Sequence, residues 1–435
     1  MNEFICQLGG YLSGSLRVPS DKSISHRSIM LSAIAEGTSH IEGFLCGEDS
    51  LNTMRAFQSM GVNIERYDDK LVVAGVGLHG LKASEDHLNL GNSGTAMRLL
   101  LGLLAGQKFD SCLVGDESLS SRPMSRVIDP LVSMGAAITS EPGGRAPLRV
   151  AGNQKLTAIS YRLPMASAQV KSCILLAGLY AEGVTTIYEP ALSRDHSERM
   201  LRGFGVEVDS TDHTIQIEGG QTLHACNIDI PADISSAAFF MVAASIADGS
   251  QIVLNHVGIN PTRIGVIEIL RLMGANIEII NQGEFGGEPV ADVVVRSAPL
   301  HGIDIPHDLV PLAIDEFPVL FIAAACAEGT TRLFGAEELR VKESDRIQVM
   351  ADGLNTLGVQ ATPTPDGMII EGGQLRHGRV DAHGDHRIAM AFSVAALRAN
   401  GDVHIDNCIN VNTSFPGFIE LAQKVGMRVN YYDPG

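Results

Sequence analysis

The feature that most constrains this chain is a sixfold internal repeat. Six segments of small apolar residues have the pattern of a helix, and each ends at a glycine before a β-branched run: Gly37, Gly106, Gly183, Gly249, Gly329 and Gly401. A second helix pattern in each repeat ends at a further glycine, 22 to 29 residues later: Gly61, Gly135, Gly205, Gly274, Gly358 and Gly426. Helices commonly end at a residue with positive φ, which glycine adopts without strain. We therefore expect left-handed helix ends at all of these glycines.

Six repeats of about 72 residues account for the whole chain. The first helix of each repeat is rich in Ala and Ser and has no polar face, which predicts that it is buried. Solenoid repeats are shorter, at roughly 20 to 50 residues, so we favour closed α/β domains of three repeats each. The boundary is expected near 228–234, where Pro231 interrupts the pattern. This predicts one domain of residues 21–234 and another of residues 235–435 with residues 1–20, whose strand pairs with the last repeat.

Composition excludes several classes of protein. The chain has 32 Lys and Arg against 50 Asp and Glu, a net charge of −18, which argues against a general nucleic-acid or anionic-membrane binder. Its seven cysteines are scattered without a CxxC pair, so neither a disulfide framework nor a structural zinc site is expected. We find no signal peptide and no apolar run of the roughly 18 residues that a membrane span needs. We expect a cytoplasmic monomer without a metal or cofactor.

Two motifs point to functions that their surroundings do not support. The segment GVGLHG, Gly75 to Gly80, matches a dinucleotide-binding pattern, but the residues after it lack a helical period, which favours a hairpin. Histidines and aspartates gather near the last repeat as a possible metal cluster: His377, Asp381, His383, Asp385 and His386. Their spacing matches no tetrahedral template, so no metal site is expected there.

The residues just before the buried helices carry the clearest chemical signal. Polar segments stand at residues 20–27, 91–98, 165–171, 231–236, 313–317 and 383–387. Helix capping explains their Ser, Asp and Asn residues. It does not explain cations in the first turns, namely Lys22, Arg27, Arg98 and Arg387, because the helix dipole is positive at that end. These cations, together with free backbone N–H groups, predict a site for a multiply charged anion.

Two loops add to this predicted site. SLSSRPMSR contributes Arg122, and ELRVKESDR contributes Lys342, Glu343 and Arg346. A charge run is usually a solvated face, but cations that recur at equivalent places in an acidic chain favour a focused cationic cleft. The carboxylates of Asp315 and Glu343 stand beside these cations in the sequence, as groups that transfer protons in such a cleft would.

Eight motifs in order, PSDKSISHR, GNSGTAMR, DESLSSRPM, ASAQ, DEFPVL, RVKESDR, GDHRIAM and TSFPGF, resemble the 5-enolpyruvylshikimate-3-phosphate (EPSP) synthase family. The resemblance covers essentially the whole chain. It implies a two-domain inside-out α/β barrel of six βαβαββ repeats, three per domain, that closes on its substrates. It also implies transfer of the enolpyruvyl group of phosphoenolpyruvate to the 5-hydroxyl of shikimate 3-phosphate, with release of phosphate, on the shikimate pathway to chorismate and aromatic amino acids.

The resemblance assigns roles position by position. Residues expected to bind shikimate 3-phosphate are Lys22, Ser23, Arg27, Ser167, Gln169, Asp315 and Lys342. Residues expected to bind phosphoenolpyruvate are Lys22, Asn92, Gly94, Arg122, Gln169, Arg346 and Arg387, with Thr95 and Arg98 in support. The catalytic residues implied are Asp315, Glu343 and Lys22, with Asp315 as general base. Glyphosate is expected to compete with phosphoenolpyruvate, because Gly94 leaves room for it.

The chain departs from the family pattern at a few positions. Leu99, Ala168 and Thr413 stand where many members have Pro, Ser and Lys, and the segment 193–200 belongs to a less common sequence class in which Arg194 is a candidate substitute contact. One alternative is UDP-N-acetylglucosamine enolpyruvyl transferase, whose mobile loop typically carries a Cys that GDESLSSRPM lacks. Another is a repeat scaffold that binds anions without catalysis, and such a scaffold would need no carboxylate at Asp315 or Glu343.

Overall fold

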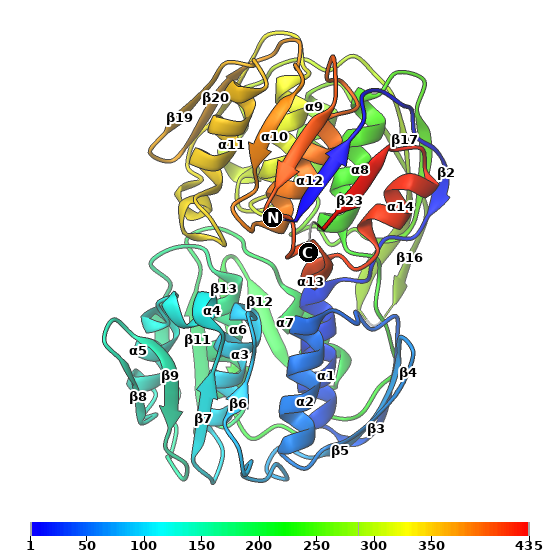
Figure 1. The fold of residues 1–435 in the computed structure, drawn as a ribbon. Helices are drawn as coiled ribbons and strands as arrows, with labels where there is room; N and C mark the ends of the chain where they lie inside the picture. The colour runs from blue at the N-terminus through cyan, green and yellow to red at the C-terminus, as the bar shows by residue number, and fades with distance from the viewer. Residues whose placement is uncertain (1, 286, 434–435) are drawn as a thin grey trace. The chain divides into compact units, whose positions relative to one another are not determined.

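The protein has a mixed α/β fold that forms two compact units (Figure 1). A computed structural model describes residues 2–285 and 287–433. Unit 1 comprises Met1–Pro19, Pro231–Gly283 and Pro289–Gly435, and unit 2 comprises Ser20–Ile230 and Glu284–Glu288. The chain thus changes unit next to Pro19 and Pro231, close to the expected boundaries at residues 20 and 234. Sequence patterns gave no sign that residues 284–288 would group with unit 2, and the two predicted domains as folding units remain a prediction.

Six apolar helices lie in the interior of the two units. They are α1 (Lys22–Ala33), α3 (Gly94–Ala105) and α6 (Ala168–Gly178) in unit 2, and α8 (Ile234–Ile246), α10 (Phe317–Ala325) and α12 (His386–Ala395) in unit 1. Every residue of α8 and of α10 is buried, which confirms the expectation from their composition. These helices contact one another within each unit. Most of their length is apolar, although α1 also carries buried polar residues such as His26, Arg27 and Ser32.

The second helix of each repeat is amphipathic. These helices are α2 (Glu48–Ser59), α5 (Ser125–Ser133), α7 (His196–Gly203), α9 (Gly265–Leu272), α11 (Arg346–Thr356) and α14 (Phe418–Lys424). Short helical segments complete the set: α4 (Glu117–Ser121), α13 (Val411–Ser414), η1 (His307–Leu309) and η2 (Glu337–Val341). No helix in the described part of the chain has both the length and the apolar character needed to cross a membrane.

Unit 2 contains three four-stranded sheets that share one pattern, a parallel pair followed by antiparallel strands. The first has the order β14 (Ile228–Asp229), β3 (Glu36–Glu42), β5 (Lys70–Val76), β4 (Asn63–Tyr67). The second has the order β6 (Leu88–Asn89), β7 (Ser111–Val114), β9 (Arg145–Val150), β8 (Ile138–Glu141). The third has the order β10 (Ser160–Arg162), β11 (Val184–Tyr188), β13 (Thr214–Glu218), β12 (Val208–Thr211).

Unit 1 also contains three sheets. One has the order β16 (Asn276–Phe285), β17 (Glu288–Arg296), β15 (Gln251–Gly258), β2 (Ser13–Leu16). Another has the order β18 (Thr330–Leu333), β20 (Gly367–Glu371), β19 (Ala361–Thr364). The last has the order β21 (Gly378–Asp381), β22 (Val403–Asp406), β1 (Glu3–Cys6), β23 (Val429–Tyr432). The end of β16 and the start of β17 belong to the segment that groups with unit 2.

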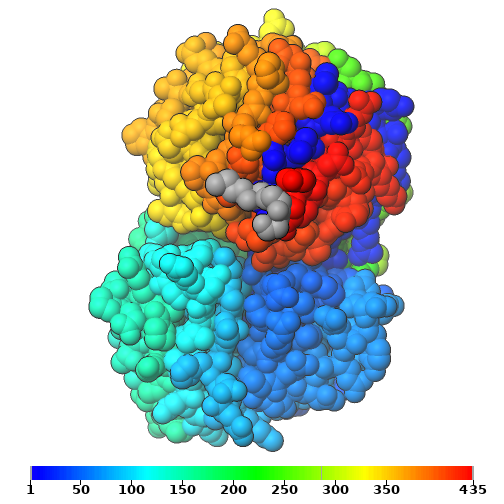
Figure 2. All heavy atoms as spheres, in the orientation of Figure 1, coloured from blue at the N-terminus to red at the C-terminus, as the bar shows by residue number. Residues whose placement is uncertain are grey.

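The N-terminal segment completes two sheets of unit 1 rather than one. Strand β1 lies antiparallel between β22 and β23, as expected for a strand that pairs with the last repeat. Strand β2 lies parallel to β15 of the fourth repeat, which the sequence did not indicate. Figure 2 shows the dark blue N-terminal residues beside the red C-terminal residues on the surface of this unit. The first residues of the chain thus hold together strands from its second half.

The expected left-handed helix ends are confirmed at the six glycines after the second helices and are wrong at the six after the first helices. Four of these six, Gly37, Gly183, Gly249 and Gly329, have positive φ but lie two to four residues beyond the C-cap of the helix. All six glycines after the second helices have positive φ, from 81° at Gly358 to 110° at Gly426. Gly106 instead has φ of −90°, and Gly401 is also outside the left-handed region. A Cβ on Gly106 would lie 2.1 Å from Cγ of Tyr180, and one on Gly401 would lie 2.7 Å from Cβ of His377. At these two positions glycine is needed for close packing and not for its backbone conformation.

The GVGLHG segment has no nucleotide-binding geometry. Its first two residues end strand β5, which forms a hairpin with β4 through the pairing of Tyr67 with Lys70. Residues 77–87 form no helix, so no helix N-terminus follows the glycines to receive a pyrophosphate. The segment thus begins in the second strand of a hairpin, whose turn lies before it at residues 68–69.

The two reasons for glycine predict different responses to substitution. Gly106→Ala should destabilise the protein by about 1 to 3 kcal/mol through overpacking against Tyr180, and Gly106→Asn should cost more because its side chain is larger. At Gly329, where φ is 94° and a Cβ would meet nothing within 4 Å, Asn should cost less than Ala, because Asn tolerates the left-handed region. Urea unfolding of the four variants measures these differences, and the same order of Ala and Asn at both positions would contradict the assignment.

Candidate active site

The polar segments before the interior helices act first as helix caps. Side chains of Asp21, Ser93, Ser167, Asp233 and Asp385 each accept a hydrogen bond from a backbone N–H in the first turn of the helix that follows. These five caps confirm the expectation from residue type. The sixth helix, α10, differs because Glu316 occupies its N-cap position without a capping side-chain bond. Each cap fixes the start of a buried helix. Many predicted site residues lie within or beside those starts, whereas Arg122 lies at the end of α4 and Lys342, Glu343 and Arg346 lie at the start of α11.

Two cations of α1 have very different surroundings in unit 2. Lys22 is partly exposed and forms an ion pair with Asp49 of helix α2. Arg27 is almost fully buried: its Nε donates to Oγ of Ser197 at 2.7 Å, and its Nη2 donates to Oγ of Ser172 at 2.8 Å. Burial lowers the pKa of the Arg27 guanidinium to about 10, which leaves it charged at neutral pH. Of the two, Lys22 is the cation more open to a ligand.

A second group in unit 2 joins the start of α3 to the start of α6. Gln169 bridges the two helices, because its Oε1 accepts from Nη1 of Arg98 at 2.5 Å and its Nε2 donates to Oγ1 of Thr95 at 3.0 Å. The amide of Gln169 is therefore already held by two residues that the sequence assigned only a supporting role. This arrangement agrees with that supporting role and fixes the orientation of the amide.

Arg122 stands at the C-cap position of α4, and its guanidinium group bonds to the segment before α3 and to α4. Its Nη2 donates to Oδ1 of Asn92 at 2.6 Å and to Oγ of Ser118 at 3.2 Å. A Cβ on Gly94 would lie 3.3 Å from a guanidinium nitrogen of Arg98 and 3.4 Å from one of Arg122. The glycine thus gives the two guanidinium groups room at the first turn of α3. The predicted residues Asn92, Gly94 and Arg122 come together in this part of unit 2.

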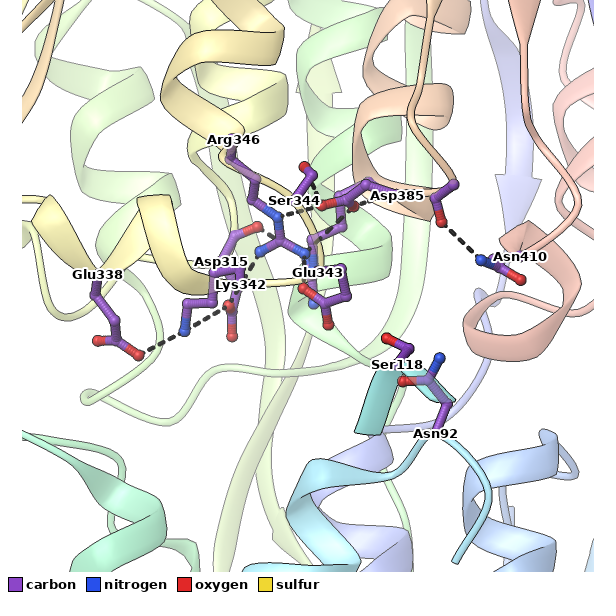
Figure 3. Close-up of polar contacts among 12 residues, drawn as sticks. Asn92, Ser118, Asp315, Glu338, Lys342, Glu343, Ser344, Arg346, Asp385 and Asn410 are labelled. Carbon is purple, nitrogen blue, oxygen red and sulfur yellow. Dashed lines mark hydrogen bonds and ion pairs between the residues drawn. The ribbon is translucent and has the colours of Figure 1, made fainter. Parts of the chain in front are cut away.

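In unit 1, Arg346 is the centre of a cluster of carboxylates (Figure 3). Its Nε donates to Oδ2 of Asp385 at 2.8 Å, its Nη2 donates to Oε2 of Glu343 at 2.6 Å, and its Nη1 lies 3.5 Å from Oδ1 of Asp315. Only 1% of the Arg346 side chain is exposed. Burial by itself would lower the pKa of Arg346, but the ion pairs with Asp385 and Glu343 outweigh it and raise that pKa. Arg346 is therefore a permanently charged group that organises three acids.

Asp315 lies between several cations of unit 1. Besides Arg346, the Nζ of Lys342 is 3.5 Å from its Oδ1, and Nη1 of Arg387 donates to its backbone carbonyl at 3.0 Å. Lys342 also donates to Oε1 of Glu338 at 2.6 Å (Figure 3). Asp315, Lys342, Arg346 and Arg387, which come from three separate segments of the sequence, are thus neighbours. Nearby cations stabilise the anionic form of such a carboxylate.

Asp385 was considered from the sequence only as part of a possible metal cluster. The structure gives it two other roles, as the cap of α12 and as the main partner of Arg346. Although burial acts to raise it, Arg346 holds the pKa of Asp385 below its usual range. In the same segment, Asp381 accepts hydrogen bonds from the backbone of His383 and from Asn407. Within the described residues no group of three or more His, Cys, Asp or Glu side chains is arranged to hold a metal ion.

Sequence reasoning missed a buried charged network in the segment 193–200. Lys171 forms ion pairs with Glu189 at 2.9 Å and with Glu198 at 2.8 Å, and all three side chains are at most 2% exposed. His196 in the same segment bonds Oε1 of Glu288 at 2.8 Å. Lys171 is the last residue of the segment MASAQVK and lies in an otherwise apolar helix pattern. That lysine was the only sign in the sequence of a buried ion pair. Next to this network, Arg194 is half-buried and acts electrostatically on Arg27.

Comparison with known proteins decides the family. The profile of EPSP synthase (3-phosphoshikimate 1-carboxyvinyltransferase) matches residues 6–421. The chain belongs to the EPSP synthase family. Relatives named 3-phosphoshikimate 1-carboxyvinyltransferase include one from Alkalilimnicola ehrlichii, 64% identical over 99% of this chain and 97% of the relative, and one from Legionella pneumophila, 56% identical over 99% and 100%.

Solved structures agree with this membership. EPSP synthase from Acinetobacter baumannii is 54% identical and superposes with a TM-score of 0.91 over 100% of both chains. The enolpyruvyl transferase NikO from Streptomyces tendae is 18% identical and has a TM-score of 0.79 over 99% of both chains, which is a likeness of fold. The family expected from the eight sequence motifs is confirmed.

The surroundings of His26 predict an acid-sensitive fold. His26 is fully buried in α1, where Nδ1 bonds Oγ1 of Thr53 at 2.8 Å, and burial lowers its pKa to about 3. An unfolded histidine has a pKa of about 6.5, so between these values the unfolded chain binds a proton that the folded chain does not. The free energy of unfolding should therefore fall as the pH drops below 6.5, by up to about 1.4 kcal/mol per pH unit from this residue.

Urea unfolding of wild type and His26→Gln at several pH values between 6.5 and 5 tests this. In the variant, the difference in bound protons between the unfolded and folded states should be smaller by roughly one, so its free energy of unfolding should depend less on pH. His40→Gln, which removes an exposed histidine from β3, is the matched control. Equal pH dependence in His26→Gln and wild type would show that His26 is not the group responsible.

Proposed function

We propose that this chain transfers the enolpyruvyl group of phosphoenolpyruvate to the 5-hydroxyl of shikimate 3-phosphate and releases inorganic phosphate. The observation that carries the proposal is the Arg346 cluster, in which two solvent-accessible carboxylates, Asp315 and Glu343, lie on one buried guanidinium beside Lys342. A reaction with proton transfers at an oxygen and at a carbon, and with two anionic substrates, needs both features. Family membership and the names of the relatives support the same reaction.

Charge complementarity supports the proposed substrate contacts. In unit 2 they are Lys22, Ser23, Arg27, Ser167 and Gln169 for shikimate 3-phosphate, and Lys22, Asn92, Gly94, Arg122 and Gln169 for phosphoenolpyruvate. In unit 1 they are Asp315 and Lys342 for shikimate 3-phosphate, and Arg346 and Arg387 for phosphoenolpyruvate. Guanidinium groups match carboxylate and phosphate oxygens two at a time. Arg27 and Arg346 are largely occupied by protein acceptors, so we propose that Lys22, Arg122 and Arg387 give the more direct contacts.

The proposed mechanism uses the two carboxylates in separate steps. In the addition, Asp315 takes the proton of the 5-hydroxyl as that oxygen bonds to C2 of phosphoenolpyruvate, and Glu343 delivers a proton to the methylene carbon. In the elimination, the new methyl group returns a proton to Glu343 as the C–O bond to phosphate breaks, and the proton held by Asp315 leaves with the phosphate, so that both carboxylates return to their starting state. Lys22 and the guanidinium groups stabilise the negative charge of the departing phosphate. No redox step is involved, because the electrons of the C=C bond are restored in the product.

The alternatives have less support. A UDP-N-acetylglucosamine enolpyruvyl transferase would be expected to carry a Cys in the loop GDESLSSRPM, and residues 115–124 contain none. The named relatives also favour shikimate 3-phosphate as acceptor. A non-catalytic scaffold offers no reason for Glu343 to pair with a buried arginine at 2.6 Å while remaining one-third exposed.

We also propose that the chain is an inside-out α/β barrel of six βαβαββ repeats, three in each unit. Support comes from the three sheets in each unit and from the interior position of α1, α3, α6, α8, α10 and α12. The sheet of β18, β20 and β19 has no fourth strand. In the place of a parallel strand it has only isolated bridges, between His301 and Glu328 and between Asp304 and Arg332.

The direct test is phosphate release from phosphoenolpyruvate with each acceptor in turn. We expect release that depends on shikimate 3-phosphate, with enolpyruvyl shikimate 3-phosphate identified by mass spectrometry. UDP-N-acetylglucosamine should give none. Release with the nucleotide sugar alone, or with neither acceptor, would overturn the proposed function.

Asp315→Asn and Glu343→Gln should each lower kcat by roughly 10² to 10⁴, the range for a positioned proton-transfer group. In deuterated water, Glu343→Gln should also suppress deuterium entry into the product methylene, whereas Asp315→Asn should act mainly on steps at the hydroxyl. Glu338→Gln, which removes the other carboxylate on Lys342, is the control and should retain near-normal kcat. Turnover within a few-fold of wild type in both test variants would leave the family intact and remove the mechanism.

Arg122→Lys should raise the KM for phosphoenolpyruvate by roughly tenfold, because an ammonium group cannot reproduce the planar fork that holds Asn92 and a substrate carboxylate or phosphate together. The KM for shikimate 3-phosphate should change little. Arg126→Lys, at an exposed position of α5, is the matched control. A change confined to the KM for shikimate 3-phosphate would assign Arg122 to the other substrate.

A further inference from the structure

A second buried ion pair lies in unit 1 and has no place in the mechanism above. Arg263 stands just before helix α9, and Glu316 occupies the N-cap position of α10. Their charged groups approach to 3.5 Å, with 4% of the Arg263 side chain and 0% of the Glu316 side chain exposed. Neither residue was singled out in the sequence as a functional candidate.

Ser235 joins this pair to the start of α8. Nη2 of Arg263 donates to Oγ of Ser235 at 2.6 Å, and that hydroxyl in turn donates to Oε1 of Glu316. The same Nη2 lies 3.4 Å from Oδ1 of Asp233, the residue that caps α8. The guanidinium and the carboxylate thus tie the N-terminal end of α8 to the N-terminal end of α10.

Stability alone gives little reason for an ion pair at this place. Every residue of α8 and α10 is buried, and most are apolar. Taking two charges out of water is costly, and apolar side chains of similar volume are often equally stable or more stable. What a bonded ion pair adds over an apolar contact is a fixed geometry for the backbone that carries it. Glu316 directly follows Asp315, the proposed general base.

Asp315 is held on its other side by different groups. Its backbone carbonyl accepts from Arg387 at the start of α12, and its carboxylate faces Lys342 and Arg346 at 3.5 Å. Residues 315 and 316 are therefore held in two directions. Asp315 contacts α12, the start of α11 and the loop before it, and Glu316 contacts α8. Loss of the second set of bonds would leave the start of α10 free to turn.

We propose that Arg263 and Glu316 are a positioning pair that holds the backbone at Asp315 so that its carboxylate meets the substrate hydroxyl. This inference rests on the proposed function, because it assumes that Asp315 is the base. The pair does not contact substrate in this proposal. It acts through one peptide unit, and a misplacement of about 1 Å at a reacting group can lower a rate by about a hundredfold.

The pair also carries no net charge. Removal of either charge should therefore change the pH dependence of kcat, which a purely structural pair would not do. The charged groups that face Asp315 are Lys342, Arg346 with its partners Glu343 and Asp385, and Arg387. Removal of the arginine would add an unbalanced buried anion next to this set, whereas neutralisation of Glu316 would add an unbalanced buried cation. The two changes should shift the protonation of the base in opposite directions.

The experiment compares Arg263→Met, Glu316→Gln and the double variant with wild type in the phosphate-release assay with shikimate 3-phosphate, across pH. Arg263→Met should lower kcat by roughly tenfold to a hundredfold, with both KM values within a few-fold of wild type. The acidic limb of the kcat–pH profile of this variant should move to higher pH by roughly half a unit or more. Glu316→Gln keeps the size and most bonds of Glu316, and its acidic limb should move to lower pH. In the double variant the limb should return toward that of wild type.

Two further variants separate positioning from loss of stability. Arg263→Lys retains the charge without the fork, so it should keep the wild-type acidic limb while lowering kcat. Val242→Ala removes buried volume from α8 and should cost about 1 to 2 kcal/mol of stability, but it should leave kcat and the acidic limb unchanged. Urea unfolding ranks all variants by stability.

The outcomes are distinct. If Arg263→Met and Glu316→Gln follow Val242→Ala, with kinetics and pH limbs like those of wild type, the pair is structural and the inference is wrong. If their limbs move in the same direction, the electrostatic part is wrong. If wild type itself releases no phosphate with shikimate 3-phosphate, the proposed function fails and not merely the positioning role.

Discussion

The structure depends on the burial of its six interior helices. A helix that is covered on all sides leaves backbone N–H groups unpaired only at its N-terminal end, and a polar side chain elsewhere along it needs a partner from a neighbouring element. In this protein caps such as Asp21, Ser93 and Asp385 satisfy the N-terminal ends, and the cations stand within one or two turns of them. The burial of the apolar helices therefore also gathers the caps and several of the cations at a few loop-to-helix junctions.

The buried charges of this protein are tolerated because each has partners from neighbouring elements. Arg346 meets three carboxylates, Lys171 meets two, and Arg27 meets two serine hydroxyls and a backbone carbonyl. Each pair would be costly if one member were removed, because the other would remain as an uncompensated charge. The side chains are consequently held in one orientation before any ligand arrives, which is the preorganisation that electrostatic catalysis needs.

Pairing also sets how substrates would bind. Lys22 faces Asp49, and Lys342 faces Glu338 and Asp315. An anionic substrate must therefore share or displace a carboxylate of the protein at these lysines. The net charge of the whole chain is −18, so its overall field repels an anionic substrate. Attraction of such a substrate therefore depends on the local cations.

The sequence by itself determined the repeat, the interior helices and the residues that cap them. These features are local: a left-handed helix end needs glycine, and a buried helix start needs an acceptor such as Ser167. The family, and with it the candidate residues, also followed from short motifs. What only the tertiary structure decided are relations between distant segments. Position 106 requires glycine because Tyr180 packs against it. Strand β2 pairs with β15, and Glu316 forms an ion pair with Arg263. No local pattern encodes such contacts, because each depends on which buried surface a folded neighbour presents.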